Sequence, residues 1–410
     1  MLEALPQKWE HYSDFTLLPP NAFLSEPWPQ VLHQIIHLDY QQPSPAAKPL
    51  SRIQQLEAIL QDALQSTHIA RKAIIPVQDL LRRPKIRPLA GDWGVHNRFK
   101  TFVEDSHLLI EHSPVASLPP SSSCPSREIK ESVPGEGTVA PKDIDEDLDF
   151  RGAYWAMTSQ NHVWYSWAPM FTMFSAGNIT EKERVAHSRA IFDARDKVVV
   201  DLYAGIGYFT LVYLVHAGAR IVHACEWNPW SVEGLCRGAT KNGIEWEVTQ
   251  DSTQVISAPS ISLPSTTTTT TAASSSSSHP APTKPKSTRL GKLQVYPGDN
   301  ASWIRCFENT AHHVNLGLIP SSEQGWVLAV RALCPIQGGF LHVHQNVRQG
   351  EEPEFERRLI DELHRLFDIW KLQQQQGKWD IHVRHVECVK SFAPMVYHYV
   401  FDVECRPPQP

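Results

Sequence analysis

The sequence contains no apolar run of about 18 residues, the length that a helix needs to cross a membrane. Its first residues, Met1-Leu-Glu-Ala-Leu-Pro-Gln-Lys, lack the charged start and the long apolar region of a secretory signal peptide. Both absences argue against a membrane protein and against export. We therefore expect a cytoplasmic protein with no membrane partner.

Closely paired cysteines are also missing. The seven cysteines are odd in number and widely spaced, and no C-x-x-C motif occurs. Neither a disulfide framework nor a zinc site is therefore indicated, and we expect no bound metal. Reduced thiols in a cytosolic protein are the simplest interpretation, and we expect Cys225 to be structural.

A positive net charge is absent as well, since the formal net charge is −6 at pH 7. No global positive field attracts nucleic acid, and we expect no DNA partner. A nucleic-acid function is weakened but not excluded, because basic patches are local. The segment 71–87 is one such patch, with prolines interleaved among Arg71, Lys72, Arg82, Arg83, Lys85 and Arg87. It either contacts phosphate groups or forms a solvated face.

A chain of 410 residues is long enough for two domains. Residues 250–288 contain runs of threonine and serine followed by prolines, a composition that buries too little apolar surface to offset the entropy cost of ordering. Strand-like segments flank this stretch, so we interpret it as an insertion within one domain. Residues 113–149, which are rich in serine and proline and then acidic, are interpreted as a solvated loop, with an acidic interaction tail as the alternative.

From residue 186 onward, the pattern alternates between strands and helices. We expect strands at 197–202, 220–225, 293–296, 313–319, 338–345, 380–388 and 396–404, and helices at 207–217, 229–241, 322–334 and 352–374. Seven strands joined by crossover helices predict an α/β doubly wound sheet, mostly parallel, whose last two strands form an antiparallel hairpin at one edge. This layout matches the Rossmann-like class I methyltransferase fold.

We place the Rossmann-like catalytic domain at 186–405. Residues 1–112 then form a smaller N-terminal domain, in which Ser51–Thr67 has the apolar spacing of an amphipathic helix. Residues 150–185 are expected to connect the two domains and to contribute to a cofactor site.

The run Val198-Val-Val-Asp-Leu-Tyr-Ala-Gly-Ile-Gly is typical of a buried strand followed by a glycine turn and a helix. Gly205 and Gly207 allow the backbone to turn tightly and to approach a ligand, and Asp201 stands at the strand end, where open α/β sheets bind ligands. Thr210 replaces the third glycine of the dinucleotide fingerprint. The motif therefore fits S-adenosylmethionine better than NAD, with a ligand-free strand–turn–helix as the alternative.

Polar residues also follow the next strands. Glu226 closes Ile221-Val-His-Ala-Cys, roughly 20 residues after the glycine turn, where a ribose-binding carboxylate is expected. Gly298-Asp-Asn follows the strand at 293–296, and Asp299 or Asn300 there can take the adenine amino group. Gly-Asp-Asn is also a common turn. In combination with the glycine turn, these residues favour S-adenosylmethionine.

Two polar residues lie upstream of the glycine turn. Asn178 or Thr180 can cap the helix that follows, which leaves Ser175 and Lys182 unexplained. A hydroxyl and an ammonium can hold a carboxylate, such as the methionine end of S-adenosylmethionine. A sulfonium has three electrophilic carbons, and the one in line with the nucleophile reacts, so the position of this tail would decide which group is transferred.

The segment Asn315-Leu-Gly-Leu-Ile-Pro-Ser-Ser ends the fourth expected strand. Asn315 and Pro320 are candidates for contact with the substrate. Adenine- and cytosine-amino methyltransferases carry Asn/Asp-Pro-Pro-Tyr at this place, and no aromatic residue stands beside Pro320. Methylation of an exocyclic amine is therefore disfavoured.

Five segments resemble the aminocarboxypropyltransferase family of wybutosine synthesis, which is the sister of the tRNA guanine-37 N1-methyltransferases. They are Phe174-Ser-Ala-Gly-Asn-Ile-Thr-Glu-Lys, Asp201-Leu-Tyr-Ala-Gly-Ile-Gly-Tyr-Phe-Thr, His223-Ala-Cys-Glu-Trp-Asn-Pro, Gly298-Asp-Asn and Asn315-Leu-Gly-Leu-Ile-Pro-Ser-Ser. The resemblance covers about 165–405 apart from the insertion, and the N-terminal part is only loosely similar. One departure is Gly238, which should weaken its helix by about 1 kcal/mol relative to alanine.

The resemblance implies transfer of the 3-amino-3-carboxypropyl group of S-adenosylmethionine to C7 of 4-demethylwyosine, at position 37 of phenylalanine tRNA. It also implies an N-terminal domain that helps to hold tRNA. The cofactor contacts that it implies are Ser175, Lys182, Glu226, Asp299 and Asn300. We expect a monomer whose partner is tRNA.

Other functions stay open at this point. A tRNA guanine-37 N1-methyltransferase would use the same cofactor and tRNA, and a non-catalytic tRNA-binding module could retain the fold. An NAD-dependent enzyme is disfavoured by the missing third glycine. The sequence assigns no general base, since each histidine candidate is as readily a core or surface residue. These candidates are His223, His312, His313, His342 and His344.

Overall fold

The computed structural model describes residues 8–24, 52–72, 86–94, 149–250, 254–257, 290–370 and 377–408, with a few single residues at 28–34 and 84. Residues 113–148 of the loop expected at 113–149, most of the insertion expected at 250–288, and Arg82, Arg83 and Lys85 lie outside the described residues. The chain divides into two compact units, Met1–Ala156 with Ala168–Met173, and Met157–Trp167 with Phe174–Pro410. No described helix has the length and apolar character needed to span a membrane.

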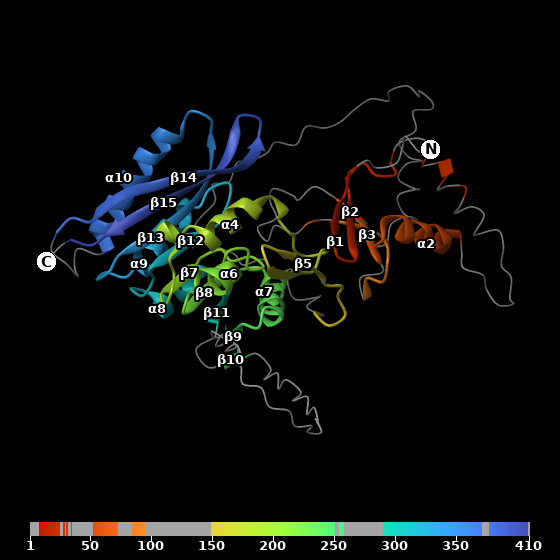
Figure 1. Cartoon of the computed structure of the whole chain (residues 1–410), viewed down its shortest axis with the longest axis horizontal. Coiled ribbons are helices and arrows are strands. Elements are labelled where there is room, and N and C mark those ends of the chain that lie inside the picture. Colours follow the sequence, from red (N-terminus) through yellow and green to blue (C-terminus); the bar gives the residue numbers. More distant parts are fainter. Residues whose placement is uncertain are drawn as a thin grey trace, which may run out of the picture. The chain divides into compact units, whose positions relative to one another are not determined.

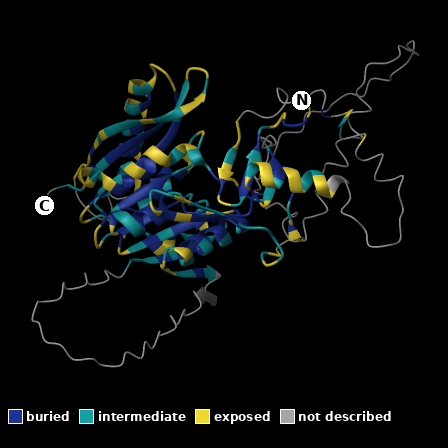
Figure 2. Cartoon of the chain, turned by 45° about the vertical axis from the view of Figure 1, so that its right-hand side comes forward, coloured by how far each residue is buried: buried dark blue, intermediate teal, exposed yellow. Residues whose placement is uncertain are grey.

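The first unit contains a four-stranded sheet in the order β1-β2-β3-β4. Its strands are β1 (Glu10–Tyr12), β2 (Phe15–Leu18), β3 (His68–Arg71) and β4 (Arg87–Ala90). The expected amphipathic helix is confirmed as α2 (Arg52–Leu64), whose Leu60 is buried against this sheet. Ile59, an apolar residue of the same helix, is exposed, and Figure 2 shows the exposed outer surface of α2.

Part of the basic patch is used inside this unit. Arg71 is buried, and its Nη1 donates to the carbonyl oxygen of Ala22 at 3.1 Å. Lys72 forms an ion pair with Glu10, and Arg87 is exposed. Arg71 therefore belongs neither to a solvated face nor to a phosphate-binding surface, because its buried guanidinium donates a hydrogen bond within the first unit.

The second unit contains a nine-stranded sheet in the order β10-β9-β11-β8-β7-β12-β13-β15-β14 (Figure 1). The strands are β7 (Val198–Asp201), β8 (Ile221–Glu226), β9 (Glu245–Gln250), β10 (Gln254–Ser257), β11 (Lys292–Pro297), β12 (His313–Leu316), β13 (Gly339–Arg348), β14 (Asp380–Ala393) and β15 (Val396–Arg406). The six central strands, β9, β11, β8, β7, β12 and β13, pair in parallel. At the edges, β10 pairs antiparallel with β9, and β15 pairs antiparallel with both β13 and β14.

The expected α/β class, the mostly parallel sheet and the C-terminal edge hairpin are confirmed. The expected number of seven strands is too small, because β9 and β10 also belong to the sheet. These two strands lie at the opposite edge from the hairpin, and β10 falls inside the stretch 250–288 that we expected to be an insertion. Neither sequence has the apolar run of a central strand.

Helices cover both faces of the sheet. On one face lie α8 (Asn300–Phe307), α9 (Trp326–Ala332) and α10 (Glu352–Trp370). On the other lie α4 (Ile179–His187), α6 (Thr210–Val212) with the π-helical turn η4 (Tyr213–Ala217), and α7 (Pro229–Lys241). The helix expected at 207–217 begins only at Thr210, because residues 207–209 still belong to the glycine turn, and α8 was not expected.

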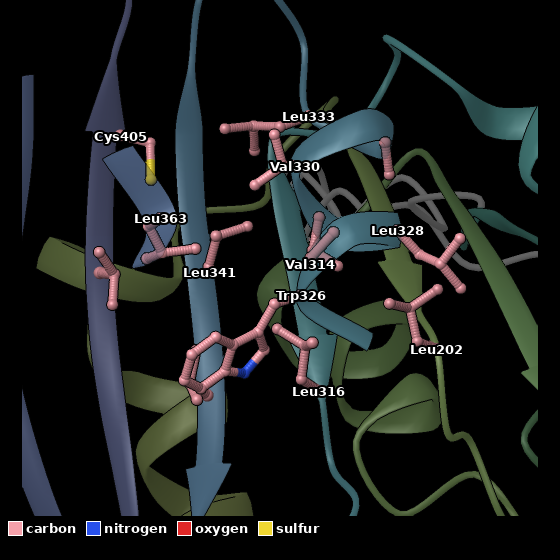
Figure 3. Close-up of a cluster of buried hydrophobic side chains, with 14 of the residues drawn as sticks. Leu202, Val314, Leu316, Trp326, Leu328, Val330, Leu333, Leu341, Leu363 and Cys405 are labelled. Carbon is pink, nitrogen blue, oxygen red and sulfur yellow. The ribbon is translucent and has the colours of Figure 1, made fainter. Parts of the chain in front are cut away.

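The larger hydrophobic cluster lies between the sheet and α9 and α10. Figure 3 shows Leu202, Val314, Leu316, Leu341 and Cys405 from strands or strand ends meeting Trp326, Leu328, Val330, Leu333 and Leu363 from the helical side. Burial of one such side chain contributes roughly 1.5–3 kcal/mol. This cluster therefore holds β12, β13 and β15 together and fixes the strand ends that lead into the site.

Helix α7 approaches the strand β6 (Val163–Trp167) closely; β6 pairs with β5 (Ala156–Gln160). A Cβ on Gly234 would lie 2.7 Å from the carbonyl oxygen of Ser166, and one on Gly238 would lie 3.1 Å from Cδ1 of Leu211. Asn242, just beyond the helix, donates to the carbonyl of Trp164 at 2.8 Å. Gly238, which lowers the helix propensity of α7, thus lies where this helix packs closely against Leu211 and β6.

We expect Gly234→Ala to lower the free energy of unfolding by about 1–2 kcal/mol, because overpacking against a backbone oxygen outweighs the gain of about 1 kcal/mol in helix propensity. Gly238→Ala is the matched control: its nearest neighbour is the flexible end of a leucine, so it should stay within about 0.5 kcal/mol of the wild type. Denaturant unfolding measures both changes, and equal effects would contradict the expectation.

Candidate functional site

The candidate site lies at the carboxyl ends of β7, β8, β11 and β12. These strands run parallel, with Asp201 opposite Ala224 and Pro297 opposite Glu226 in register. The loops that follow them therefore meet at one edge of the sheet. Ligands of open α/β sheets bind at this edge.

Asp201 closes the turn after β7. Its side chain is fully buried; Oδ2 accepts a hydrogen bond from the hydroxyl of Thr210 at 2.8 Å, and Oδ1 accepts one from Nδ2 of Asn315 at 3.0 Å. Burial raises the pKa of Asp201 in spite of these donors. Thr210 therefore has a definite role where a dinucleotide fingerprint has glycine.

The two substrate-loop candidates differ in position. The amide of Asn315 is buried and committed to Asp201. Pro320 is exposed; its peptide bond with Ile319 is cis, and its carbonyl oxygen accepts the N–H of Asn346 at 2.8 Å. Only Pro320 of this pair lies at the surface.

The glycine turn is joined directly to the acid of the second strand. Gly205 and Gly207 have φ angles of 57° and 93°, in the region that favours glycine. The N–H of Gly205 donates to Oε2 of Glu226 at 2.8 Å, and the N–H of Asn228 donates to Oε1 at 2.8 Å. At Gly207 a Cβ would lie 2.6 Å from Cδ1 of Leu235. The turn expected from the sequence therefore requires both glycines.

The loop after β11 contacts the loop after β7. Asp299 is the exposed N-cap of α8, and its Oδ1 accepts the N–H of Ala301 at 3.0 Å. Asn300 donates from Nδ2 to the carbonyl oxygen of Leu202 at 3.1 Å. The pair thus combines an ordinary capping role with a link between two loops of the site.

Ser175 and Lys182 both contact Tyr208. The N–H of Ser175 donates to the hydroxyl of Tyr208 at 3.1 Å. Lys182 is fully buried, with Nζ 4.3 Å from the ring centre of Tyr165 and 5.4 Å from that of Tyr208. Its Nζ donates to Oε1 of Gln160 at 2.6 Å. Burial, and then the nearby charge of Lys390, lower the pKa of Lys182 to about 7.

Helix α4, which carries Lys182, is held by buried ion pairs rather than by a side-chain cap. Asn178 occupies the N-cap position without a side-chain cap bond, and Thr180 lies inside the helix, so the expected capping role is wrong for both. Arg184 instead contacts both carboxylate oxygens of Glu181, at 2.7 and 2.8 Å, and the carboxylate of Asp402 on β15.

All five histidines considered as general bases contact other groups of the protein. Their partners are Tyr296 for His223, Gln337 for His312, His342 for His313, Asp402 for His342, and His398 for His344. Burial lowers the pKa of His223 to about 4 and lowers the pKa of His313, His342 and His344. Cys225 is buried in the core, as expected.

Three residues at this site were not identified from the sequence. Tyr208 follows Gly207, and Trp227 follows Glu226 and is 46% exposed. Both residues directly follow a motif residue, and this position next to the motif was the signal in the sequence that could have identified them. Lys390 lies 215 positions from Ser175, yet its Nζ is 3.3 Å from the Ser175 hydroxyl. Only the folding of β14 onto this edge brings them together.

The low pKa of Lys182 predicts a pH-dependent contribution to stability. The ordinary pKa of 10.5 falls to about 7 in the folded protein. Between these pH values the unfolded chain therefore binds more protons than the folded protein. The free-energy cost of burying Lys182 consequently grows as the pH falls from about 10 to 7. Relative to the wild type, Lys182→Met should therefore become more stable over that decrease. Urea unfolding at several pH values measures this, with Lys241→Met, at an exposed lysine, as control; a pH-independent difference would contradict it.

The chain also matches known proteins in sequence. The TRM5/TYW2 methyltransferase domain matches residues 163–260. The chain is 30% identical over 401 residues to tRNA wybutosine-synthesizing protein 2 of Schizosaccharomyces pombe, covering 98% of this chain and 73% of that protein. It is 35% identical over 272 residues to the tRNA wybutosine-synthesizing protein 2 homolog of Danio rerio, covering 60% of this chain and 54% of that protein. The chain thus spans about half the length of the Danio rerio relative.

A solved structure has a similar fold. Pyrococcus horikoshii TYW2 in complex with MeSAdo aligns with a TM-score of 0.51 and 16% identity, over 99% of this chain and 94% of that one. This likeness shows the Rossmann-like architecture alone. The sequence match to the Schizosaccharomyces pombe protein extends through both units, and it shows that the chain belongs to the tRNA wybutosine-synthesizing protein 2 family.

Proposed function

We propose that the chain is an S-adenosylmethionine-dependent transferase that moves the 3-amino-3-carboxypropyl group to C7 of 4-demethylwyosine at position 37 of phenylalanine tRNA. The observation that carries this proposal is the glycine turn bonded to Glu226 at the strand ends, in a chain whose relatives are named for wybutosine synthesis. The partner is tRNA, and the first unit, with its exposed Arg87, helps to hold it.

The chemistry of the donor and acceptor groups suits the nucleoside half of S-adenosylmethionine. Oε2 of Glu226 accepts the N–H of Gly205 and Oε1 accepts that of Asn228, and the backbone of Trp227 also interacts with this carboxylate. A carboxylate has about four lone-pair sites, so Glu226 can still accept a ribose hydroxyl. A Cβ on Gly298 would meet no atom within 4 Å, so the backbone after β11 is open beside Asp299 and Asn300. In this proposal Asp299 and Asn300 contact the adenine, and Asp201 acts by holding the turn closed.

The amino-acid half determines the product. S-adenosylmethionine, when bound, supplies a sulfonium with three electrophilic carbons, of which the one in line with the nucleophile reacts. Ser175 and Lys182 would hold the tail so that the γ-carbon faces the base. Their link through Tyr208 ties the tail side of the site to the glycine turn. The exposed Pro320 lies on the loop after β12 and is the substrate-side candidate.

We expect Glu226→Ala to weaken S-adenosylmethionine binding by about 1–3 kcal/mol, because charge-assisted hydrogen bonds to the ribose are lost. Calorimetric titration measures the change. Glu233→Ala is a matched control, since Glu233 on α7 forms only a partly exposed ion pair with Arg237 and its removal should leave binding unchanged. Unchanged affinity in the Glu226 variant would remove Glu226 from the site.

The transferred group is read from the mass of the modified nucleoside. Incubation with S-adenosylmethionine and phenylalanine tRNA that carries 4-demethylwyosine should add about 101 Da, because the γ-carbon is positioned for transfer. The matching domain is described jointly for TRM5 and TYW2, so methyl transfer to guanine-37 is the second candidate. A gain of about 14 Da on tRNA with unmodified guanine-37 would indicate that reaction. Binding of the cofactor with no mass change on either tRNA would indicate a non-catalytic module.

A further inference from the structure

The C-terminal hairpin β14–β15 brings a second ammonium group to Ser175. Nζ of Lys390 on β14 lies 3.3 Å from the Ser175 hydroxyl oxygen. A Cβ on Gly177 would lie 3.1 Å from both Cδ and Nζ of Lys390, so the absence of a side chain at Gly177 leaves room for the lysine. The lysine side chain therefore packs over the 3-10 turn η3 (Ala176–Asn178) and reaches the serine that precedes it.

Neither ammonium near Ser175 has a counter-ion in the described part of the chain. Among these residues, no carboxylate lies within 4.0 Å of Nζ of Lys390 or of Lys182. The two ammonium groups are close enough for Lys390 to lower the pKa of Lys182. His398, opposite Lys390 on β15, is buried, and its pKa is lowered to about 4, so at neutral pH it is uncharged and is neither a counter-ion nor a further cation. Two lysine amino groups and a hydroxyl without a counter-ion favour an anion, whose charge would in turn favour the protonated form of Lys182.

We propose that Lys390 is a further binding residue of the site, whose ammonium, together with the Ser175 hydroxyl, holds the carboxylate of the 3-amino-3-carboxypropyl group. This inference rests on the proposed function. The Ser175 oxygen accepts from Lys390 and keeps its own proton to donate to the carboxylate. The C-terminal hairpin thereby forms one wall of the tail-binding side.

A donor carboxylate fits this place better than a tRNA phosphate. The backbone of Ser175 is bonded to Tyr208, which belongs to the glycine turn that leads to Glu226. Lys182, beneath Tyr208, is fully buried, and Lys390 is half-buried. The cations therefore lie inward, on the side of the cofactor turn, and an anion attached to the cofactor can reach them without a nucleic-acid backbone entering.

The affinities of three ligands that differ only in the amino-acid tail distinguish a contact with the carboxylate from contacts with the rest of the cofactor. S-adenosylmethionine carries the carboxylate, decarboxylated S-adenosylmethionine lacks only that group, and methylthioadenosine lacks the whole amino-acid tail. Calorimetry on the full chain with Lys390→Met should show about 10-fold or greater loss of affinity for S-adenosylmethionine, and changes within about twofold for the other two ligands.

Two further variants control for charge and for folding. Arg384→Met removes a cation from the same strand, where Arg384 pairs with Glu404, and should leave all three affinities unchanged. Lys390→Arg should retain most of the S-adenosylmethionine affinity because it keeps a donor cation. Lys390→Gln replaces Lys390→Met if the latter does not fold by circular dichroism.

An equal loss for all three ligands, or no loss for any, would overturn the assignment of Lys390. So would weakened tRNA binding with normal S-adenosylmethionine binding, which would assign Lys390 to a phosphate. Failure of the wild-type chain to bind S-adenosylmethionine would overturn the proposed function, and the inference with it. Normal wild-type binding with an unaffected Lys390 variant overturns the inference alone.

Discussion

The buried carboxylate of Asp201 is the group on which the geometry of the site depends. A carboxylate enclosed in a protein is costly unless its oxygens accept hydrogen bonds. Thr210 at the start of α6, which follows β7, and Asn315 on the adjacent strand β12 provide them. Satisfying this one group closes the turn after β7. The closed turn directs the N–H of Gly205 to Glu226, and so aligns the ends of β7 and β8.

A second set of buried charges holds the part of the candidate site around Ser175 and Lys182. Arg184 joins Glu181 on its own helix to Asp402 on β15, so α4 is fastened to the C-terminal hairpin. Removing one partner of such a buried network leaves an uncompensated charge, which typically costs about 3–5 kcal/mol. The same hairpin carries Lys390. The hairpin β14–β15 thus both holds the helix that carries Lys182 and brings the ammonium group of Lys390 to Ser175.

The sequence predicted best where local pattern and tertiary environment agree. The apolar run before Asp201, the helix after Asn228 and the edge hairpin each carry a periodicity that their burial reinforces. Prediction was weaker where tertiary contacts override local preference. Strand β9 is polar because it lies near a sheet edge, and Gly238 weakens a helix in isolation but allows close approach to its neighbours. Arg71, basic and flanked by a polar segment, is buried because its guanidinium satisfies a carbonyl.

The sequence by itself determined the class of fold and the pairing of a glycine turn with an acid at the next strand end, because both depend on residue type at short, regular spacing. Tertiary structure alone decided which polar groups lie exposed at the strand-end edge of the sheet and which stabilise the interior. The side chain of Asn315 is buried and bonded to Asp201, and the ammonium group of Lys182 lies against aromatic rings. Lys390 joined Ser175 from the far end of the chain. Such long-range contacts depend on strand order and helix packing, which no local spacing encodes.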